Sequence, residues 1–293
     1  FKSGIKQNLN KEQIAEIISK NSLNSERTIF LGTSHSKIDN KKYIKSTNFF
    51  PGQIISSTNM MIDLSTEDKT ITFHQVDSYD WVLIKNADLS EWKIEFVGAD
   101  ENPKSQKFSK QRFNEFGLTG CLTIFNSKLN QLKIKADGGA CEDTLNIVSS
   151  SGYLNSIYIT NAWADAVDFD YSKIKLNTLN VHGAGNDCFD LSGGKYSINI
   201  MDLNSCRDKA ISVGEASVLD TNFVNLSNSK IGVSSKDLSS VIIKKARMEK
   251  VSTCLEAFQK KQEFGGAHLI IEELHCSGDT KTDVNSVILK GSE

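Results

Sequence analysis

Three five-residue strings decide the fold of this chain: Asp143-Thr-Leu-Asn-Ile, Asp165-Ala-Val-Asp-Phe and Asp187-Cys-Phe-Asp-Leu, whose first residues are 22 positions apart. A fourth string follows at the same step and weaker copies come after it, beginning at Lys209, Ser229 and Thr253. Each period contains a second β-type run, bounded by polar turns. Two short strands in a repeat of this length predict one coil of a β-solenoid.

The repeat also predicts which side chains share a face. Successive side chains of a strand point to opposite faces, so the third and fifth residues of each string point inward and the fourth points outward. Because coils stack about 4.8 Å apart, outward residues at one position form a row along the solenoid. The fourth-position row is predicted as Asn146, Asp168, Asp190, Ser212, Gly232 and Glu256. The row two places further is predicted as Val148, Asp170, Ser192, Gly214, Ser234 and Phe258.

We therefore predict an all-β chain, a right-handed parallel β-helix of about 22 residues per coil with an N-terminal capping helix, in one continuous domain. Residues 1–25 form the cap, since Asn10 suits a helix start and Ile14, Ile17 and Ile18 have helical spacing. Residues 26–116 are predicted as irregular early coils, with a loop excursion over 99–116, and residues 117–293 as the regular β-helix.

Composition excludes several classes of function. The chain has 34 basic and 36 acidic residues and a net charge of −2, which does not favour nucleic acid as a partner. No stretch of 18 or more uninterrupted apolar residues occurs, so no membrane span is predicted.

The six cysteines fall into pairs at 121 and 141, 188 and 206, and 254 and 276, without a CxxC or other metal-ligand pattern. We interpret them as free thiols buried in a stacked core. Disulfides between neighbouring coils are the alternative in an oxidising compartment.

Several of the strings resemble a set found in bacterial parallel β-helix domains of polysaccharide-related or cell-envelope proteins, some of them fused to CotH-like modules. The resemblance covers about 115–265, and its central strings are 165–170, 185–192, 208–215, 235–239 and 258–261. More broadly, the architecture resembles the pectin-lyase-like superfamily of polysaccharide lyases, hydrolases and epimerases. Val181-His182-Gly183 is similar to one element of polygalacturonase-type hydrolases, although a partnering basic triplet is missing. The resemblance implies a polysaccharide partner, further domains in a longer parent chain, and a bacterial cell-envelope or secreted location.

Stacked aspartates indicate where a site would lie. Asp168 and Asp190 are predicted in mid-strand, where aspartate is disfavoured, so their mutual repulsion needs an offset. Neighbouring lysines, a bound cation or a raised carboxyl pKa would each supply one. The predicted catalytic residues are Asp168, Asp190, Asp187, Lys209 and Lys236. The predicted substrate-binding residues are Asp165, Asp170, His182, Glu215, Asp237, Glu256 and Lys260. A calcium ion between Asp168, Asp170 and Asp190 is the one cofactor that the pattern suggests.

Structural roles compete with these assignments. Aspartates satisfy backbone groups at solenoid corners, which suits Asp143, Asp165 and Asp187. Lys209 and Lys236 each adjoin an aspartate in the sequence and would then form ordinary ion pairs.

Two classes of function follow from the sequence. The first is cleavage of an acidic glycan, either by hydrolysis with two carboxyl groups or by β-elimination with a lysine base. The second is a non-catalytic glycan-binding or spacer module, in which Trp163, Tyr171 and Phe258 could stack on sugars.

Overall fold

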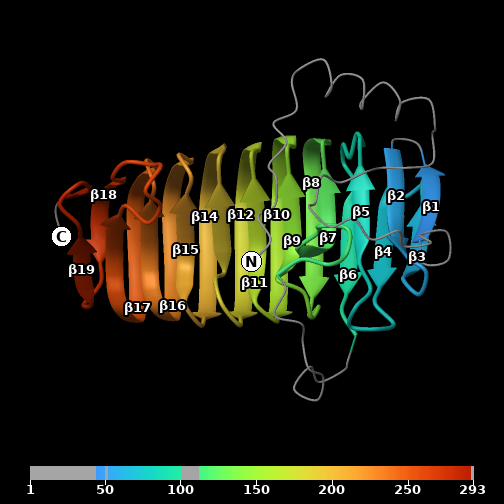
Figure 1. Cartoon of the computed structure of the whole chain (residues 1–293), viewed down its shortest axis with the longest axis horizontal. Helices are drawn as coiled ribbons and strands as arrows, with labels where there is room; N and C mark the ends of the chain where they lie inside the picture. Colours follow the sequence, from blue (N-terminus) through green and yellow to red (C-terminus); the bar gives the residue numbers. More distant parts are fainter. Residues whose placement is uncertain (1–43, 50–51, 100–111, 292–293) are drawn as a thin grey trace, which may run out of the picture. The chain divides into compact units, whose positions relative to one another are not determined.

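A computed structural model describes residues 44–49, 52–99 and 112–291 (Figure 1). The chain divides into two compact units, one of residues 1–37 with 115–117 and the other of residues 38–114 with 118–293. The second unit contains the solenoid. The predicted capping helix and most of the predicted loop excursion lie outside the described residues.

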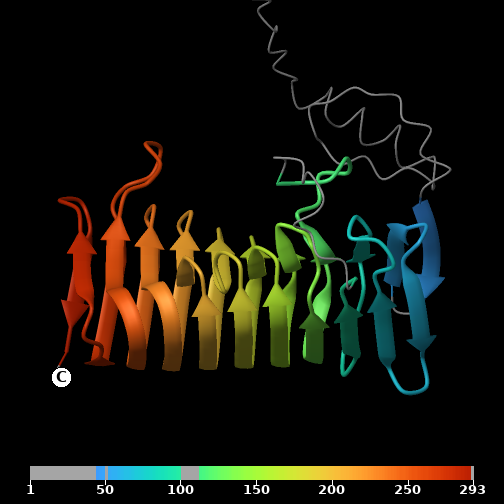
Figure 2. The ribbon, with the colours of Figure 1, turned by 90° about the horizontal axis from the view of Figure 1, so that it is seen from below.

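The described residues form a β-solenoid of about 10 turns, with about 22 residues per turn and no helix. This confirms the predicted all-β parallel architecture. Figures 1 and 2 show the strands of successive coils side by side in chain order, from the blue strands to the red ones.

Two ladders of parallel strands build each coil. The first ladder contains β5 (Val82–Lys85), β7 (Gly120–Phe125), β9 (Asp143–Val148), β11 (Asp165–Asp170), β13 (Phe189–Ser192), β15 (Lys209–Gly214), the later parts of β16 (Val218–Lys236) and β17 (Ser240–Phe258), and β19 (Asp279–Thr282). The second ladder contains β4 (Thr70–His74), β6 (Lys93–Val97), β8 (Lys128–Asp137), β10 (Ser151–Ala162), β12 (Lys173–Ala184), β14 (Lys195–Cys206), the earlier parts of β16 and β17, β18 (His268–His275) and β20 (Val287–Lys290).

The early strands differ from the predicted irregular coils. β1 (Ile44–Phe49) pairs antiparallel with β2 (Gly52–Ser57), and β2 pairs antiparallel with β5. β3 (Met61–Ser65) pairs antiparallel with β4. Antiparallel pairs need only short connections, and they carry no coil-length repeat for a period search to find.

The 22-residue step continues further than the sequence strings suggested. Lys209 pairs with Ile231, and Ile231 pairs with Thr253, so the weak copy begins at Ile231 instead of Ser229. A shift of two residues keeps the same side chains inward, because side chains alternate with period two, so the apolar pattern could not detect it. The corrected register puts Ser234 in the Asp168–Asp190 row and Lys236 in the row of Asp170.

The core runs along the inside of the coils. Phe169 packs edge-on against Phe189, with ring centroids 5.2 Å apart, and both side chains are fully buried. The buried Tyr196 lies against Phe169 and donates a hydrogen bond to its carbonyl oxygen at 2.9 Å. The inward third and fifth positions of the strings are therefore confirmed as core.

A ladder of buried serines forms the corner between the two ladders of strands. The Ser127 N–H donates to the Ser150 hydroxyl, and the Ser150 N–H donates to the Ser172 hydroxyl, each at 3.0 Å. The same contact links Ser217 to Ser239 at 3.2 Å. These hydroxyls satisfy backbone donors that the corner removes from the strand ladders.

All six cysteines are paired, which corrects the prediction of free thiols. The disulfides join Cys121 to Cys141, Cys188 to Cys206 and Cys254 to Cys276. Each bond closes a single coil on itself, because the partners are 18 to 22 residues apart. The register places Cys121, Cys188 and Cys254 in one row, three coils apart.

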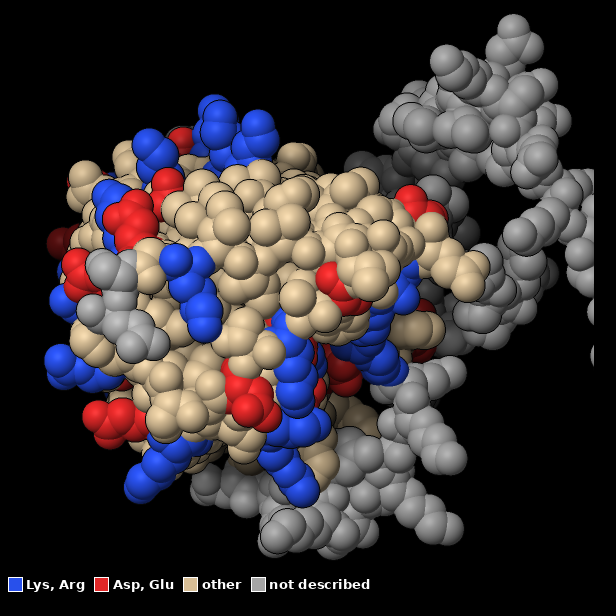
Figure 3. Space-filling model, turned by 90° about the vertical axis from the view of Figure 1, so that its left-hand side faces the viewer, with Lys and Arg blue, Asp and Glu red and all other residues tan. Residues whose placement is uncertain are grey.

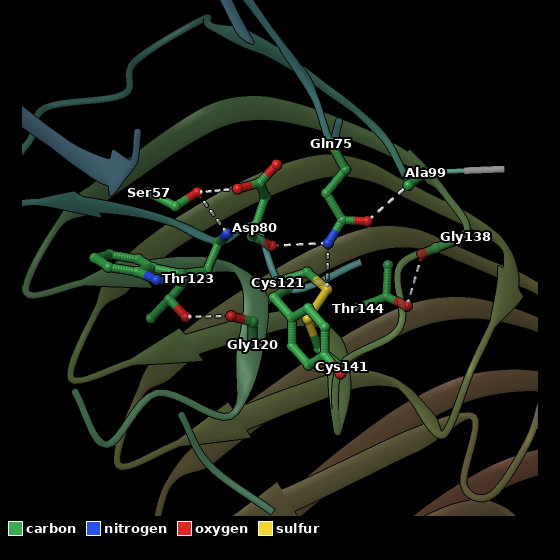
Figure 4. The surroundings of a disulfide bond; sticks show 12 residues. Ser57, Gln75, Asp80, Ala99, Gly120, Cys121, Thr123, Gly138, Cys141 and Thr144 are labelled. Atoms are coloured by element: carbon green, nitrogen blue, oxygen red, sulfur yellow. Dashed lines mark hydrogen bonds between the residues drawn. A yellow bond between two sulfur atoms is a disulfide. The ribbon is translucent and has the colours of Figure 1, made fainter. Parts of the chain in front are cut away.

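Figure 4 shows how the first disulfide meets the early strands. The buried Gln75 amide donates to the Asp80 carbonyl at 2.7 Å and lies 3.3 Å from the Cys121 sulfur. Ser57 in turn donates to the Asp80 carboxylate at 2.6 Å. These contacts connect the antiparallel strands to the first parallel coils.

Figure 3 looks onto the end of the solenoid that carries the last coil. Uncharged surface occupies its centre, with charged side chains of both signs around it. Val284, Val287 and Leu289 are exposed in this last part of the chain. Among the described residues, no helix has the length and apolar character needed to cross a membrane.

Candidate functional site

The candidate site is an acidic cluster on the outward side of β11 and β13. Asp168 pairs in register with Asn146 on β9 and with Asp190 on β13. The Asn146 amide donates to the carboxylates of Asp168 and Asp170, at 3.2 and 3.0 Å. One amide therefore bridges two carboxyl groups on the neighbouring strand, and we name Asp165, Asp168, Asp170 and Asp190 the acidic cluster.

The row is less exposed than the sequence suggested. Asn146, Ser212 and Ser234 are buried, and Asp168 and Asp190 are half-buried. One cause is the flanking row, because its Lys236 side chain extends over this row and donates a hydrogen bond to the Ser212 hydroxyl. The acidic cluster is therefore partly shielded from water.

Burial changes the protonation of this cluster. Burial raises the pKa of Asp168 well above its usual range, and the negative charges of neighbouring aspartates raise it further. The Oδ1 atom of Asp168 is buried and has no hydrogen-bond partner among the described residues, which disfavours the ionised form. Burial also raises the pKa of Asp170, against the hydrogen bond from Asn146. Asp168 and Asp170 therefore hold their protons to a higher pH than isolated aspartates do.

The opening aspartates of the strings act at corners. Asp165 accepts hydrogen bonds from the Asn186 amide and the Asp187 backbone N–H, both at 2.7 Å. Asp187 accepts the Lys209 backbone N–H at 2.9 Å. Each carboxylate therefore ties its own coil to the next coil, as expected for corner aspartates. Burial raises the pKa of Asp165 to about 7.

The two predicted catalytic lysines have different surroundings. The Lys209 ammonium pairs with Asp208 and lies 3.5 Å from Asp187, so its charge is used in an ion-pair network. Lys236 is buried, at 7% exposure, and its ammonium donates to the Ser212 hydroxyl at 2.8 Å. Among the described residues it forms no ion pair. Because Ser212 is the register partner of Asp190, this ammonium lies beside the acidic cluster.

Most of the predicted substrate-binding residues lie elsewhere. His182 is on β12, in the second ladder, where it stacks on Tyr158, so it does not join the acidic cluster. The buried Asp237 carboxylate accepts the backbone N–H groups of Lys260 and Lys261, which makes it a turn residue. Glu256 continues the row of Asp190, beyond Ser212 and Ser234.

Glu215 lies in a small hollow near the ends of β11 and β13. Its carboxylate pairs with Lys261 and accepts a hydrogen bond from the Tyr171 hydroxyl at 3.4 Å. The hollow, of about 440 Å³, is also lined by Lys195 and Phe264. Tyr171 is exposed there, as a sugar-stacking residue would be, and neither Trp163 nor Phe258 lines this hollow.

The predicted calcium site finds no support in the geometry. Within the part of the chain that the structure describes, no group of three or more His, Cys, Asp or Glu side chains is arranged to hold a metal ion. The repulsion between the aspartates is offset instead by raised pKa values and by the Asn146 amide.

Two residues of the site were not predicted as functional. Asn146 and Ser212 were placed in the correct row, but their roles as bridges to Asp168 and Lys236 depend on side-chain reach across neighbouring strands. The signal that could have found them is their membership of the same 22-residue register.

Comparisons of the chain with protein-family models, with curated proteins and with solved structures find no match. The fold and the site geometry therefore carry the functional argument.

Proposed function

We propose that the protein hydrolyses a polysaccharide with the carboxyl groups of Asp168 and Asp190. The observation that carries this proposal is their direct pairing on adjacent strands, in a setting where burial raises the pKa of Asp168. Retaining glycoside hydrolases use two carboxyl groups about 5–5.5 Å apart, one as acid and one as nucleophile. Paired residues on neighbouring strands are about 4.8 Å apart, which suits that class.

In this mechanism Asp168 donates its proton to the glycosidic oxygen as the bond from that oxygen to C1 breaks. The Asp190 carboxylate attacks C1 and forms a covalent glycosyl-enzyme. Asp168 then takes a proton from a water molecule whose oxygen attacks C1. The bond between C1 and Asp190 breaks, which releases the sugar and restores both carboxyl groups. Burial raises the pKa of Asp168, which suits its role as the acid.

The buried Lys236 favours an acidic sugar as substrate. Its ammonium lies beside the cluster without a carboxylate partner among the described residues, so a uronate or sulfate group on the substrate would supply one. The same observation favours β-elimination as the second candidate, with Lys236 as the base. The pectin-lyase-like resemblance is compatible with both reactions, because that superfamily contains hydrolases and lyases.

The test is a screen of acidic and neutral polysaccharides that records both new reducing ends and the absorbance of unsaturated sugars. We expect reducing ends without unsaturated product. Asp168→Asn and Asp190→Asn should each lower the rate by roughly 100-fold or more. Asp220→Asn is the matched control, because Asp220 is exposed on the second ladder. An unsaturated product would show that the reaction is β-elimination and not hydrolysis. Full activity in Asp190→Asn would exclude the proposed pair.

A further inference from the structure

A groove lies on the outer face of the second ladder, where β8, β10, β12 and β14 begin. It has a volume of about 720 Å³ and is separate from the acidic cluster, which lies on the first ladder. Its walls include exposed Lys128, Lys173, Lys175 and Lys195, and its floor includes the buried Leu129 and Ile174. The groove was not predicted from the sequence.

The floor of this groove also contains a glycine, Gly152. Gly152 pairs with Leu129 on one side and Ile174 on the other, in a row whose other members point into the core. Its φ of +137° is in a region that glycine adopts readily, and an added Cβ would lie 1.7 Å from the Leu129 carbonyl oxygen. The strand is also irregular just after it, between Tyr153 and Leu154. Glycine is therefore needed here, because the strand lies too close to the Leu129 backbone for any side chain to fit.

Register aligns the lysines along one edge. Lys128, Ser151, Lys173 and Lys195 are successive partners in neighbouring strands. Each directly follows a corner residue, and Ser127, Ser150 and Ser172 of that corner form the buried serine ladder. Lys175 stands in the adjacent outward row, paired with Tyr153. The lysine row is thus held in place by a rigid corner.

Four lysines and one acidic residue, Asp88, line the groove, and Asp88 interacts electrostatically with Lys128. Lys209, Lys230, Lys245 and Lys261 all form ion pairs. Within the described ranges, none of the groove lysines does. Lys173 and Lys195 are adjacent like charges, about 4.8 Å apart along the ladder. Like charges opposite each other are destabilising, so a bound anion would relieve a cost that the free protein carries.

The shape of the groove favours an extended ligand. Its lining runs from Asp88 to Val218 across six successive coils, which at about 4.8 Å per strand is roughly 24 Å. The exposed Tyr153 ring and the aliphatic stems of the lysines provide apolar surface, which suits the C–H face of a sugar ring. We propose that this groove is a second, non-catalytic binding site for an acidic polysaccharide chain that runs across the strands.

Single-stranded nucleic acid is the other extended polyanion, and the observations favour it less. Binding to single strands uses several stacking aromatic side chains, often with arginine, whereas the groove lining has Tyr153 and Tyr196, of which Tyr196 is buried, and no arginine.

The inference does not depend on catalysis, and its test measures binding in the Asp190→Asn variant, which keeps every groove residue. A loss of cleavage therefore cannot be mistaken for a loss of binding. The probes are polygalacturonate and dextran sulfate, with unsulfated dextran as the uncharged match and a thymidine 20-mer as the nucleic-acid arm. Affinity electrophoresis at low and high salt reports on all four.

We expect one or both acidic polysaccharides to bind, with affinity that falls as salt rises, and dextran not to bind. Lys173→Gln/Lys175→Gln/Lys195→Gln should weaken binding at least about tenfold, since three exposed charge contacts of modest strength are lost. The matched control Lys93→Gln/Lys133→Gln/Lys244→Gln removes the same charge from exposed lysines outside the groove and should bind normally. If both triple variants weakened binding equally, net charge alone would explain the loss, and the groove would not be the binding site. The proposal would also be overturned if neither acidic polysaccharide bound, or if the thymidine 20-mer bound more tightly than both.

Discussion

Asp168 on β11 and Asp190 on β13 are direct register partners in adjacent parallel strands. Neither forms an ion pair among the described residues, and Asp168 shares an amide donor with Asp170. Such an arrangement costs folding free energy, because Asp168 must either keep its proton or oppose the charge of Asp190. Residues that lower stability in this way are characteristic of functional sites.

The first prediction concerns this cost. Asp190→Asn should raise the free energy of unfolding by about 1 kcal/mol at pH 8, because it removes a charge that disfavours ionisation of Asp168. Urea denaturation at low salt measures the change. Asp220→Asn, on the exposed face of the second ladder, should leave the free energy of unfolding unchanged. A destabilised Asp190→Asn variant would mean that the carboxylate has a structural role.

The second prediction concerns pH. The pKa of Asp165 is raised to about 7 by burial, so the folded protein holds this proton over a range in which the unfolded chain has lost it. The free energy of unfolding should therefore fall as pH rises from about 4 to about 7, and level off above that, by up to about 4 kcal/mol for this group.

Asp165→Asn tests this directly. The variant keeps an oxygen that can accept the hydrogen bonds of Asn186 and Asp187 but cannot titrate. Urea denaturation at pH 5, 7 and 8.5 should show a flatter pH profile in the variant, with the largest gain in stability at the highest pH. Parallel profiles for variant and wild type would contradict the assignment.

The third prediction separates a structural lysine from a catalytic one. Lys209→Met leaves the buried Asp187 without its nearest positive charge and should lower the free energy of unfolding by about 2 kcal/mol. Lys230→Met is the control, because Lys230 is exposed where it pairs with Asp208, and it should change stability by less than about 0.5 kcal/mol. Equal effects of the two substitutions would show that Lys209 contributes no more than a surface charge.

The fourth prediction concerns the disulfides. Cys188→Ala/Cys206→Ala opens one closed coil and should lower the free energy of unfolding by about 3 kcal/mol. Removing the Cys254–Cys276 bond as well should lower the free energy of unfolding by a further, nearly additive amount, since the two bonds lie three coils apart. Thiol titration of the unfolded, unreduced protein provides the check. All six cysteines reacting would contradict the pairing.

The repeat was the part of the structure most accessible from sequence. A step of 22 residues sets which side chains stack, and it correctly aligned Asp168 with Asp190. The alignment slipped by two at Ile231, because a period-two pattern cannot distinguish such a shift, and this placed Lys236 outside its true row.

Other features depend on contacts that a period does not encode. The coil-length spacing of the cysteines was compatible with both free thiols and disulfides, and the distance across the coil decided between them. The groove lysines Lys173 and Lys195 share the 22-residue step, but the step does not show that their row lines a groove.

The most direct test of the account is the anomeric configuration of the first product, followed by proton NMR during cleavage of an acidic polysaccharide. A pair of carboxyl groups on adjacent register positions predicts net retention, through a glycosyl-enzyme on Asp190. Net inversion, or an unsaturated product in place of a hydrolysed one, would contradict the role assigned to Asp168 and Asp190.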